Sequence, residues 1–362
     1  SRAMSVASYF PANYREGRAA FIKVADKQGM DITTRVHPAA KGPRGRPLFM
    51  DVACAGDRAA KRALLLISGT HGVEGYFGSG VQTGLLRDGL AKRIPKGVKL
   101  VVLHALNPFG FAWDRRVNEE NADINRNFVD YRKLPANPAY DALAPWIAPK
   151  DISDDTMKEA NRRLGEYAGR HGPFALQTAI SAGQYTHADG VYFGGQRESG
   201  SASWLKYGIG EHLRGITKLV VIDYHTGLGD CGSAEMITED LPGSSAYTRQ
   251  KTIWGERIKS SEAGESVSAP LTGTIDKAMA KFMGKAELTF AALEVGTAPM
   301  RDVFNALRKD NWLHLQKKPD RSRWEAIKGE IRAAFYPDTE KWKDDVWEHA
   351  VETLDPALAS LA

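Results

Sequence analysis

The chain has 362 residues, of which 43% are hydrophobic and 26% charged, and its formal net charge is +5. This composition is ordinary for a globular enzyme with a sizeable core, and no apolar run is long enough to span a membrane. The basic residues are scattered and form no stripe interleaved with aromatic residues, so we expect neither a nucleic-acid nor a membrane partner.

Cysteine usage and the first residues bear on the compartment. The sequence contains only Cys54 and Cys231, which excludes a disulfide framework and a thiolate metal cluster. It does not begin with a positively charged segment followed by an apolar stretch. Ser1 to Ala3 precede Met4, which we expect to be the natural start. We therefore predict a cytoplasmic protein, and the sequence leaves the oligomeric state open.

The N-terminal part alternates between helical and extended patterns. Apolar residues at helical spacing predict a helix over residues 13–27, and strands are expected at 31–37 and 47–53. A short apolar run at 63–67 then predicts a buried strand. Small and apolar residues predict a helix from residue 75 to 90.

The corner between that buried strand and that helix carries the first chemical motif. His71 and Glu74 lie three residues apart in a glycine-rich segment. Open α/β sheets bind their ligands where strands end. An imidazole nitrogen and a carboxylate oxygen at this spacing can point at one zinc ion and leave a position for water. The alternative is two surface residues on one helix face, so the rest of the chain has to supply a third ligand and a general base.

Residues 111–128 are unusually polar for a segment that follows a predicted strand at 98–103. They include the pair Arg115 and Arg116, and the pair Asn125 and Arg126. A planar guanidinium can bind a carboxylate through two hydrogen bonds, and an Asn amide can help to orient it. The segment is therefore a candidate for holding an anionic substrate group, with a solvated loop as the alternative.

The middle of the chain has weaker signals. Four prolines between residues 131 and 150 predict an irregular surface connection, which leads into a helix. The loop at 186–201 is rich in glycine and aromatic residues. Long ordered loops often shape pockets, although ordinary surface structure is as good an interpretation. Gln184, Tyr185 and Tyr192 in and beside this loop are candidate substrate-binding residues.

A second motif repeats the pattern of the first. The apolar run 219–222 predicts a buried strand, which is followed by Asp223, Tyr224, His225 and then glycines. His225 is therefore placed at a strand end, where it can serve as the missing third ligand. Asp223 points to the same side of the strand and can orient a ligand, or it is a turn residue.

A third strand end carries a carboxylate. Residues 286–293 predict the last apolar strand, which stops at Glu294. A carboxylate in such a place is costly unless it is paired or used, which favours a functional role. Helices are expected at 254–260 and 276–283, and from residue 301 onward.

Over residues 63–297 the chain resembles the zinc carboxypeptidase A-like superfamily, which includes the succinylglutamate desuccinylase and aspartoacylase branch. Five pieces in the same order carry the resemblance: His71-x-x-Glu74, Arg115/Arg116, Asn125-Arg126, His225 and Glu294. The region from Gln184 to Gly195 is most similar to bacterial members without an assigned function. The resemblance implies an α/β fold: a three-layer α/β/α sandwich with a mixed, mostly parallel eight-stranded sheet. It also implies one catalytic domain over 1–362, with an inserted loop region at about 131–200 and a helical extension at about 301–362.

The resemblance further implies one zinc ion held by His71, Glu74 and His225, with Glu294 as the general base. It implies that one of Arg115 and Arg116 polarises the scissile carbonyl.

Asn125 and Arg126 match the positions that dock a substrate carboxylate. The superfamily's mobile tyrosine has no matching motif, and Tyr185 and Tyr192 are its candidates.

These residues predict a zinc-dependent hydrolase that cleaves an amide bond next to a free carboxylate. Both a metallocarboxypeptidase and an N-acyl-amino-acid deacylase fit, and the substrate is a small molecule or a short peptide. The alternative is a protein that keeps the fold and binds a metal or a ligand without turnover.

Overall fold

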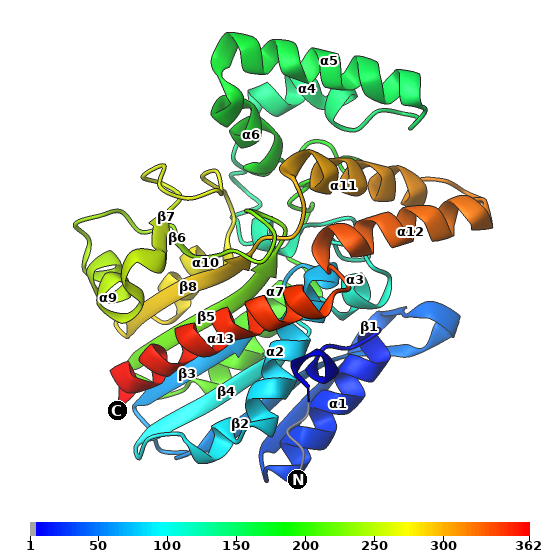
Figure 1. Ribbon diagram of the computed structural model, residues 1–362. Helices are drawn as coiled ribbons and strands as arrows, with labels where there is room; N and C mark the ends of the chain where they lie inside the picture. Colours follow the sequence, from blue (N-terminus) through cyan, green and yellow to red (C-terminus); the bar gives the residue numbers. More distant parts are fainter. Residues whose placement is uncertain (1–4) are drawn as a thin grey trace.

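A computed structural model describes residues 5–362, so the expected start at Met4 lies outside the described residues. Its centre is an eight-stranded sheet with the order β1-β2-β4-β3-β5-β8-β6-β7 (Figure 1). Four of the strand pairs are parallel and three are antiparallel, which confirms the predicted mixed, mostly parallel sheet. The strands are β1 (Asp31–Lys41), β2 (Pro47–Gly56), β3 (Arg62–Ile67), β4 (Val98–His104), β5 (Lys218–Thr226), β6 (Ala234–Thr238), β7 (Ile258–Ser260) and β8 (Glu287–Val295).

Alternate residues of the central strands pack against helices on opposite faces of the sheet. Leu64 and Leu66 of β3 belong to one hydrophobic core, whereas Leu65 and Ile67 belong to another. This alternation confirms the predicted three-layer α/β/α sandwich. The first core is covered by α1 (Tyr14–Lys27), α2 (Gly75–Arg87), α9 (Ser245–Trp254), α11 (Met300–His314), α12 (Arg321–Phe335) and α13 (Glu340–Leu361), and the second by α7 (Gly200–Trp204) and α10 (Ile275–Phe282). The short helices α3 (Pro108–Ala112) and α8 (Gly210–His212) lie in connections.

Three further helices form a group of their own beyond the sheet, at the top of Figure 1. They are α4 (Pro138–Ile147), α5 (Asp154–His171) and α6 (Pro173–Ser181), and they share a small hydrophobic cluster. Arg308 of α11 is buried and donates hydrogen bonds to the carbonyls of Trp146 and Ile147, at 2.6 and 2.9 Å. The group is thereby fastened to the C-terminal helices.

The irregular connection that we predicted for residues 131–150 is wrong where helix α4 forms. Pro138 occupies the first helical position, where its missing N–H costs nothing, and Asn137 caps the helix by accepting from the N–H of Tyr140 at 3.1 Å. Tyr140, Leu143 and Ile147 then bury one face of the helix. The burial of this face offsets the cost of Pro145 inside the helix.

The prediction of a helix over residues 254–260 is also wrong. Helix α9 ends at Trp254 because Gly255 adopts a positive φ of 58°, and Ile258–Ser260 form strand β7. Strand β7 pairs with β6, which the sequence analysis did not predict. Both strands are short and owe their conformation to pairing with distant parts of the chain.

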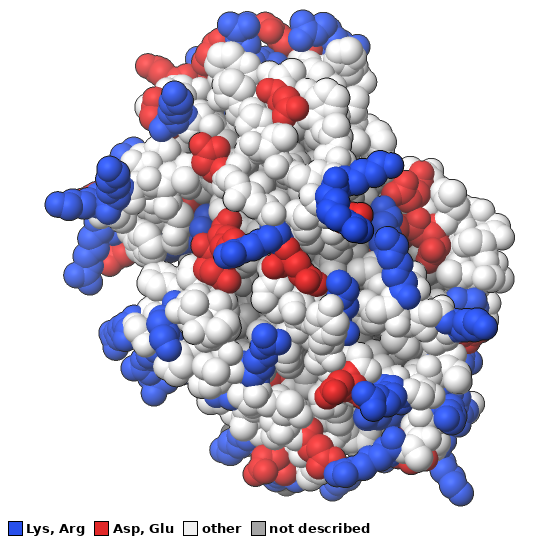
Figure 2. Space-filling model, turned by 180° about the vertical axis from the view of Figure 1, so that it is seen from behind, with Lys and Arg blue, Asp and Glu red and all other residues white. Residues whose placement is uncertain are grey.

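The surface charges are mixed. On the face in Figure 2, Lys and Arg side chains alternate with Asp and Glu, and no continuous basic surface is visible among the residues shown. Within residues 5–362 every helix is too short or too polar to cross a lipid bilayer.

Candidate metal centre and its cavity

Three predicted ligands come together at the carboxyl ends of two neighbouring parallel strands. His71 follows β3, Glu74 lies in the short 3-10 helix Gly72–Glu74, and His225 is near the end of β5. All three side chains are buried, and each offers a ligand atom within 4.8 Å of the others. Parallel pairing of β3 with β5 brings the two histidine-bearing ends side by side.

The orientation of both imidazole rings suits a metal ion. Nε2 of His71 lies 2.9 Å from Asp123 Oδ1, and Nε2 of His225 lies 2.7 Å from Asp223 Oδ2. Carboxylates in this position fix the tautomer and the ring orientation of metal-binding histidines. Each Nδ1 therefore faces Glu74, at 2.8 Å from Oε2 for His71 and 3.2 Å from Oε1 for His225.

The donor set fits a zinc ion. The Nδ1 atom of His71 is buried, and its contact with Glu74 does not have hydrogen-bond geometry. Two imidazole nitrogens and one carboxylate are ligands that catalytic zinc sites use, with a further position open.

The charges at the site favour an ionised Glu74 and a protonated His225, so His225 would release a proton on binding a cation. Burial alone raises the pKa of Glu74, but the charge of His71 and the hydrogen bond from His225 hold that pKa well below its usual value. Burial lowers the pKa of His225, yet the charge of Asp223 and hydrogen bonds to Asp223 and Glu74 raise it well above the usual value. Without a cation, the site therefore compensates its carboxylates with a protonated histidine.

A close backbone approach places an arginine against the site. A Cβ at Gly72 would lie 2.0 Å from the carbonyl carbon of Gly110, so only glycine fits there. The N–H groups of Gly72 and Val73 donate to the carbonyls of Arg116 and Arg115, at 3.2 and 2.9 Å. Residues 110–116 are thereby held beside the His71 corner.

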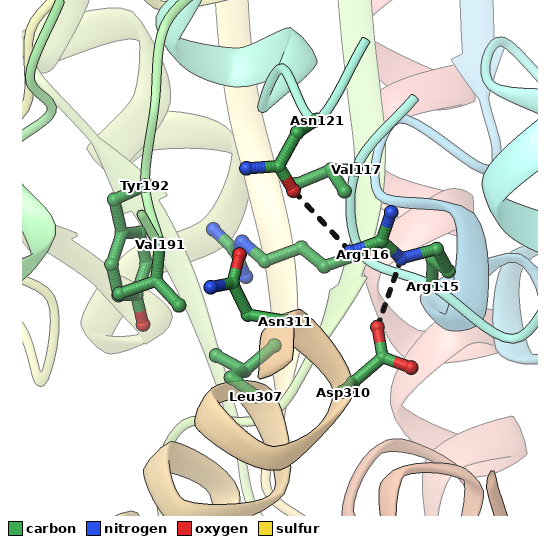
Figure 3. A pocket seen from close by; sticks show the side chains of 9 residues that line it. All are labelled: Arg115, Arg116, Val117, Asn121, Val191, Tyr192, Leu307, Asp310 and Asn311. Carbon is green, nitrogen blue, oxygen red and sulfur yellow. Dashed lines mark hydrogen bonds and ion pairs between the residues drawn. The ribbon is translucent and has the colours of Figure 1, made fainter. Parts of the chain in front are cut away.

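The two adjacent arginines have different partners, and Figure 3 shows the guanidinium group of Arg116 extended toward Tyr192, apart from that of Arg115. Arg116 contacts Glu74 Oε2 through Nη1 at 3.3 Å and Asp123 Oδ2 through Nε at 2.9 Å. Arg115 instead pairs with Asp310 of α11 at 3.0 Å and contacts Asn121. Of the two candidates for polarising a carbonyl, only Arg116 lies at the metal centre and lines its cavity.

Glu294 lies on the strand next to His225. The two residues are direct partners in the parallel β5–β8 pair. The Glu294 side chain is buried, and its Oε2 atom has no hydrogen-bond partner among the described residues. Burial and the negative charge of Glu74 raise the pKa of Glu294 to about 8. A carboxylate with these properties is suited to accept a proton near neutral pH.

Asn125 and Arg126 also line the cavity, in the 3-10 helix Ile124–Arg126. The Asn125 Oδ1 atom accepts from the N–H of Ile275 at 3.0 Å. The Arg126 guanidinium is buried and donates to the carbonyls of Ser181 and Asn125. Both side chains thus combine structural hydrogen bonds with a position on the cavity wall.

The three residues predicted from the long loop have different positions. Tyr192 lines the cavity, with its ring 5.1 Å from the guanidinium carbon of Arg116 and 5.6 Å from that of Arg126. Gln184 donates to the carbonyls of His187 and Val191, and the Tyr185 hydroxyl donates to the carbonyl of Arg126. Gln184 and Tyr185 do not line the cavity, and these contacts favour a structural role over the predicted substrate-binding one.

Asp123 is the central residue that the sequence analysis missed. Besides His71 it contacts Arg116, and Arg126 lies 3.8 Å away. Burial raises the pKa of Asp123, but the charges of these three residues hold it well below its usual range. Its place two residues before Asn125 was the only signal in the sequence.

One cavity of about 570 Å³ is lined by eight of these residues: His71, Arg116, Asn125, Arg126, Tyr192, Asp223, His225 and Glu294. The ends of β5 and β8 form its floor, with Phe290, Ala292 and Glu294 as alternate residues of β8. Apolar residues of α5, α6 and α11 form much of a wall, including Leu164, Leu176, Ile180, Met300 and Phe304.

Fold and site together define an α/β protein with a candidate single-metal centre at the carboxyl ends of its central strands. The chain belongs to the family described as "Protein of unknown function (DUF2817)", whose model matches residues 10–349. A comparison with curated protein sequences gives no match.

Several solved structures are similar to this chain at low identity. One is a succinylglutamate desuccinylase from Chromobacterium violaceum, with 16% identity over 88% of this chain and 74% of that chain, and a TM-score of 0.38. A metallo-carboxypeptidase from Burkholderia cenocepacia has 15% identity over 90% and 69%, with a TM-score of 0.44. An aspartoacylase family protein from Mesorhizobium loti has 15% identity over 78% and 66%, with a TM-score of 0.36.

Proposed function

We propose that the protein is a zinc-dependent hydrolase that cleaves an amide bond next to a free carboxylate, as a carboxypeptidase or an N-acyl-amino-acid deacylase. One observation carries the proposal: the ligand atoms of His71, Glu74 and His225 converge beside the cavity that both histidines, Glu294, Arg116 and Arg126 line. This reaction needs a metal site, a proton acceptor and two cationic groups, all within reach of one substrate molecule.

The roles follow from chemistry and position. When bound, a zinc ion would act as a Lewis acid and lower the pKa of a water molecule to about 7. Glu294 would accept a proton from the attacking water and deliver it to the leaving amine nitrogen.

The arginines would hold the substrate's negative charges. Arg116, held by Asp123 and Glu74, would donate to the carbonyl oxygen on which negative charge develops. Arg126 and Asn125 would hold the free carboxylate, and the Tyr192 ring packs near both guanidinium groups.

Two measurements test the proposal. Purified protein should contain close to one equivalent of zinc, and His71→Ala should lose it while remaining folded. A screen of N-acyl amino acids and short peptides should then find release of a free amine that a chelator stops and added zinc restores. A correctly folded protein that binds no metal would overturn the proposal. Zinc binding without any turnover would favour a binding protein instead.

A further inference from the structure

Arg115, which the proposed chemistry does not use, ends in a buried ionic cluster behind the metal centre. It belongs to the arginine segment, residues 113–116. Its Nε atom donates to Asp310 Oδ2 of α11 at 3.0 Å (Figure 3). The other oxygen of that carboxylate, Oδ1, accepts from Lys328 Nζ of α12 at 2.6 Å. At most 10% of each of these side chains is exposed, so one buried carboxylate serves two buried cations.

Lys328 also binds the backbone of the arginine segment. Its Nζ atom donates to the carbonyl oxygen of Trp113 at 2.7 Å and lies 2.7 Å from His314 Nε2. Burial lowers the pKa of His314 to about 3, so the ring is neutral and Nε2 can accept from the lysine. An ammonium group has three N–H donors, and Asp310, Trp113 and His314 each accept one.

The arginine segment is therefore held from two sides. On the side of the metal centre, the carbonyls of Arg115 and Arg116 accept from backbone N–H groups next to His71. On the far side, α11 and α12 hold it through the ionic cluster. Within the segment Asp114 has a φ of 51°, a value that residues with a side chain rarely adopt. Such a conformation persists where surrounding contacts impose it.

Stability alone does not account for a buried cluster of this kind. Taking ions out of water is costly, and apolar side chains of similar volume often join two helices as well or better. Burial raises the pKa of Asp310, but the charges of Lys328 and Arg115 hold it below its usual value, so the carboxylate is ionised. What the cluster provides is direction, because each of its N–H groups meets an acceptor at a fixed place.

We propose that Asp310 and Lys328 are positioning residues for Arg116, which they hold at the metal centre through the Arg115 side chain and the backbone of the arginine segment. The inference rests on the proposed function, in which Arg116 donates to the carbonyl oxygen on which charge develops. Asp310 and Lys328 do not line the cavity of the metal centre, so neither would touch the substrate. A displaced donor fails mainly in the transition state, so its loss should appear in kcat rather than in KM.

Two variants test the proposal without leaving an unpaired charge. Lys328→Met keeps Asp310 paired with Arg115, and Arg115→Met keeps it paired with Lys328, so at least one of them should fold and retain zinc. Each zinc-loaded protein is assayed with N-acetyl amino acids and N-benzoylglycyl dipeptides. We expect kcat to fall at least about tenfold with KM within about twofold of wild type. Arg116→Ala, which removes the donor itself, should lose about 100-fold or more.

A double variant shows whether the lysine acts through Arg116. If it does, Lys328→Met should lower kcat no further in a protein that already carries Arg116→Ala. Equal losses in both backgrounds, or an unchanged kcat in a folded Lys328→Met protein, would overturn the proposal. Lys309→Met is the matched control, because Lys309 pairs with Glu330 between the same two helices at 3.1 Å. It should keep the kcat of wild type.

Amide hydrogen exchange separates failure of the positioning role from failure of the proposed function. The N–H groups of Gly72 and Val73 are bound to carbonyls of the arginine segment. They should exchange at least about tenfold faster in Lys328→Met than in wild type or Lys309→Met, while amides of β3 keep their rates. If no substrate is cleaved but this pattern holds, the cluster still positions the segment and the hydrolase proposal falls. Unchanged exchange at Gly72 and Val73 overturns the positioning role.

Discussion

Arg126 donates twice to the carbonyl oxygen of Ser181, through Nε at 3.0 Å and Nη2 at 2.8 Å. A third hydrogen bond runs from Nη1 to the carbonyl of Asn125. A guanidinium has five N–H groups, so two remain, one on each terminal nitrogen. Bracing the end of α6 and binding a carboxylate are therefore compatible roles for this side chain.

The first prediction concerns the free carboxylate of the substrate. Arg126→Ala should reduce the preference for a free acid over its amide by about 2–4 kcal/mol, because one partner of a buried charge pair is removed. The variant should also be less stable, since the brace to Ser181 is lost. The measurement is kcat/KM for a matched acid and amide. Arg301→Ala, at an exposed arginine of the cavity wall, is the control. If Arg301→Ala abolishes the preference and Arg126→Ala does not, the carboxylate binds at α11.

The second prediction concerns the base. Glu294→Gln should retain zinc and fold while turnover falls by at least about a hundredfold, the low end of what a positioned base contributes. Metal content by mass spectrometry and unfolding by urea check the first two points, and single-turnover kinetics checks the third. Turnover close to that of wild type would place the base elsewhere.

The third prediction concerns the carboxylate behind His225. Asp223 accepts from Thr70 and lies 2.7 Å from His225 Nε2. Asp223→Asn keeps the shape but removes the charge, so zinc affinity should fall by about 10–100-fold in a competition assay with a chelating dye.

A matched Asp–His pair at the surface provides the control for Asp223→Asn. Asp141 and His187 lie 2.8 Å apart with both side chains partly exposed, and neither lines the cavity. Asp141→Asn should leave zinc affinity unchanged. An equal loss in the two variants would mean that the effect is not specific to the metal centre.

The fourth prediction is a pH dependence of stability. The folded-state pKa of Glu239 is raised from 4.5 to about 9, so the folded protein binds an extra proton between these two values. The free energy of unfolding should therefore fall as pH rises through this window. Glu239→Gln cannot lose that proton, so between pH 6 and pH 9 wild type should lose on the order of 1–3 kcal/mol more than the variant. Urea unfolding at the two pH values measures the difference, and parallel curves would contradict it.

Much of the candidate site was predictable because its signals are local. An apolar run followed by a histidine and glycines predicts a strand end with a functional side chain, and this pattern placed both His71 and His225. The choice between Arg115 and Arg116 was not predictable. It depends on Asp310 of α11, which lies 195 residues after Arg115 in the chain and pairs with Arg115. Arg116 has no such partner on α11 and contacts the candidate metal centre instead.

The two carboxylates of Glu239 and Asp276, which both line the cavity, were not predictable from the sequence for a similar reason. Glu239 follows a strand that exists only through pairing with β8 and β7, and Asp276 begins a helix from another part of the chain. Helix α4 was not predicted because its prolines indicate a loop. The burial of its apolar face, which stabilises the helix, becomes apparent only from tertiary packing. The roles of the individual site residues remain predictions for the experiments above.

The direct pairing of His225 with Glu294 limits how this protein can evolve. Successive residues of a strand point to opposite faces of the sheet, so a one-residue insertion or deletion within β5 or β8 would turn the proposed metal ligand or the proposed general base away from the cavity. Changes of chain length in this family should therefore concentrate outside these two strands. The loop at 186–199 and the group α4 to α6 are tethered by a few hydrogen bonds and a small cluster, and they can lengthen, shorten or be exchanged to suit new substrates while the pair of strands stays intact.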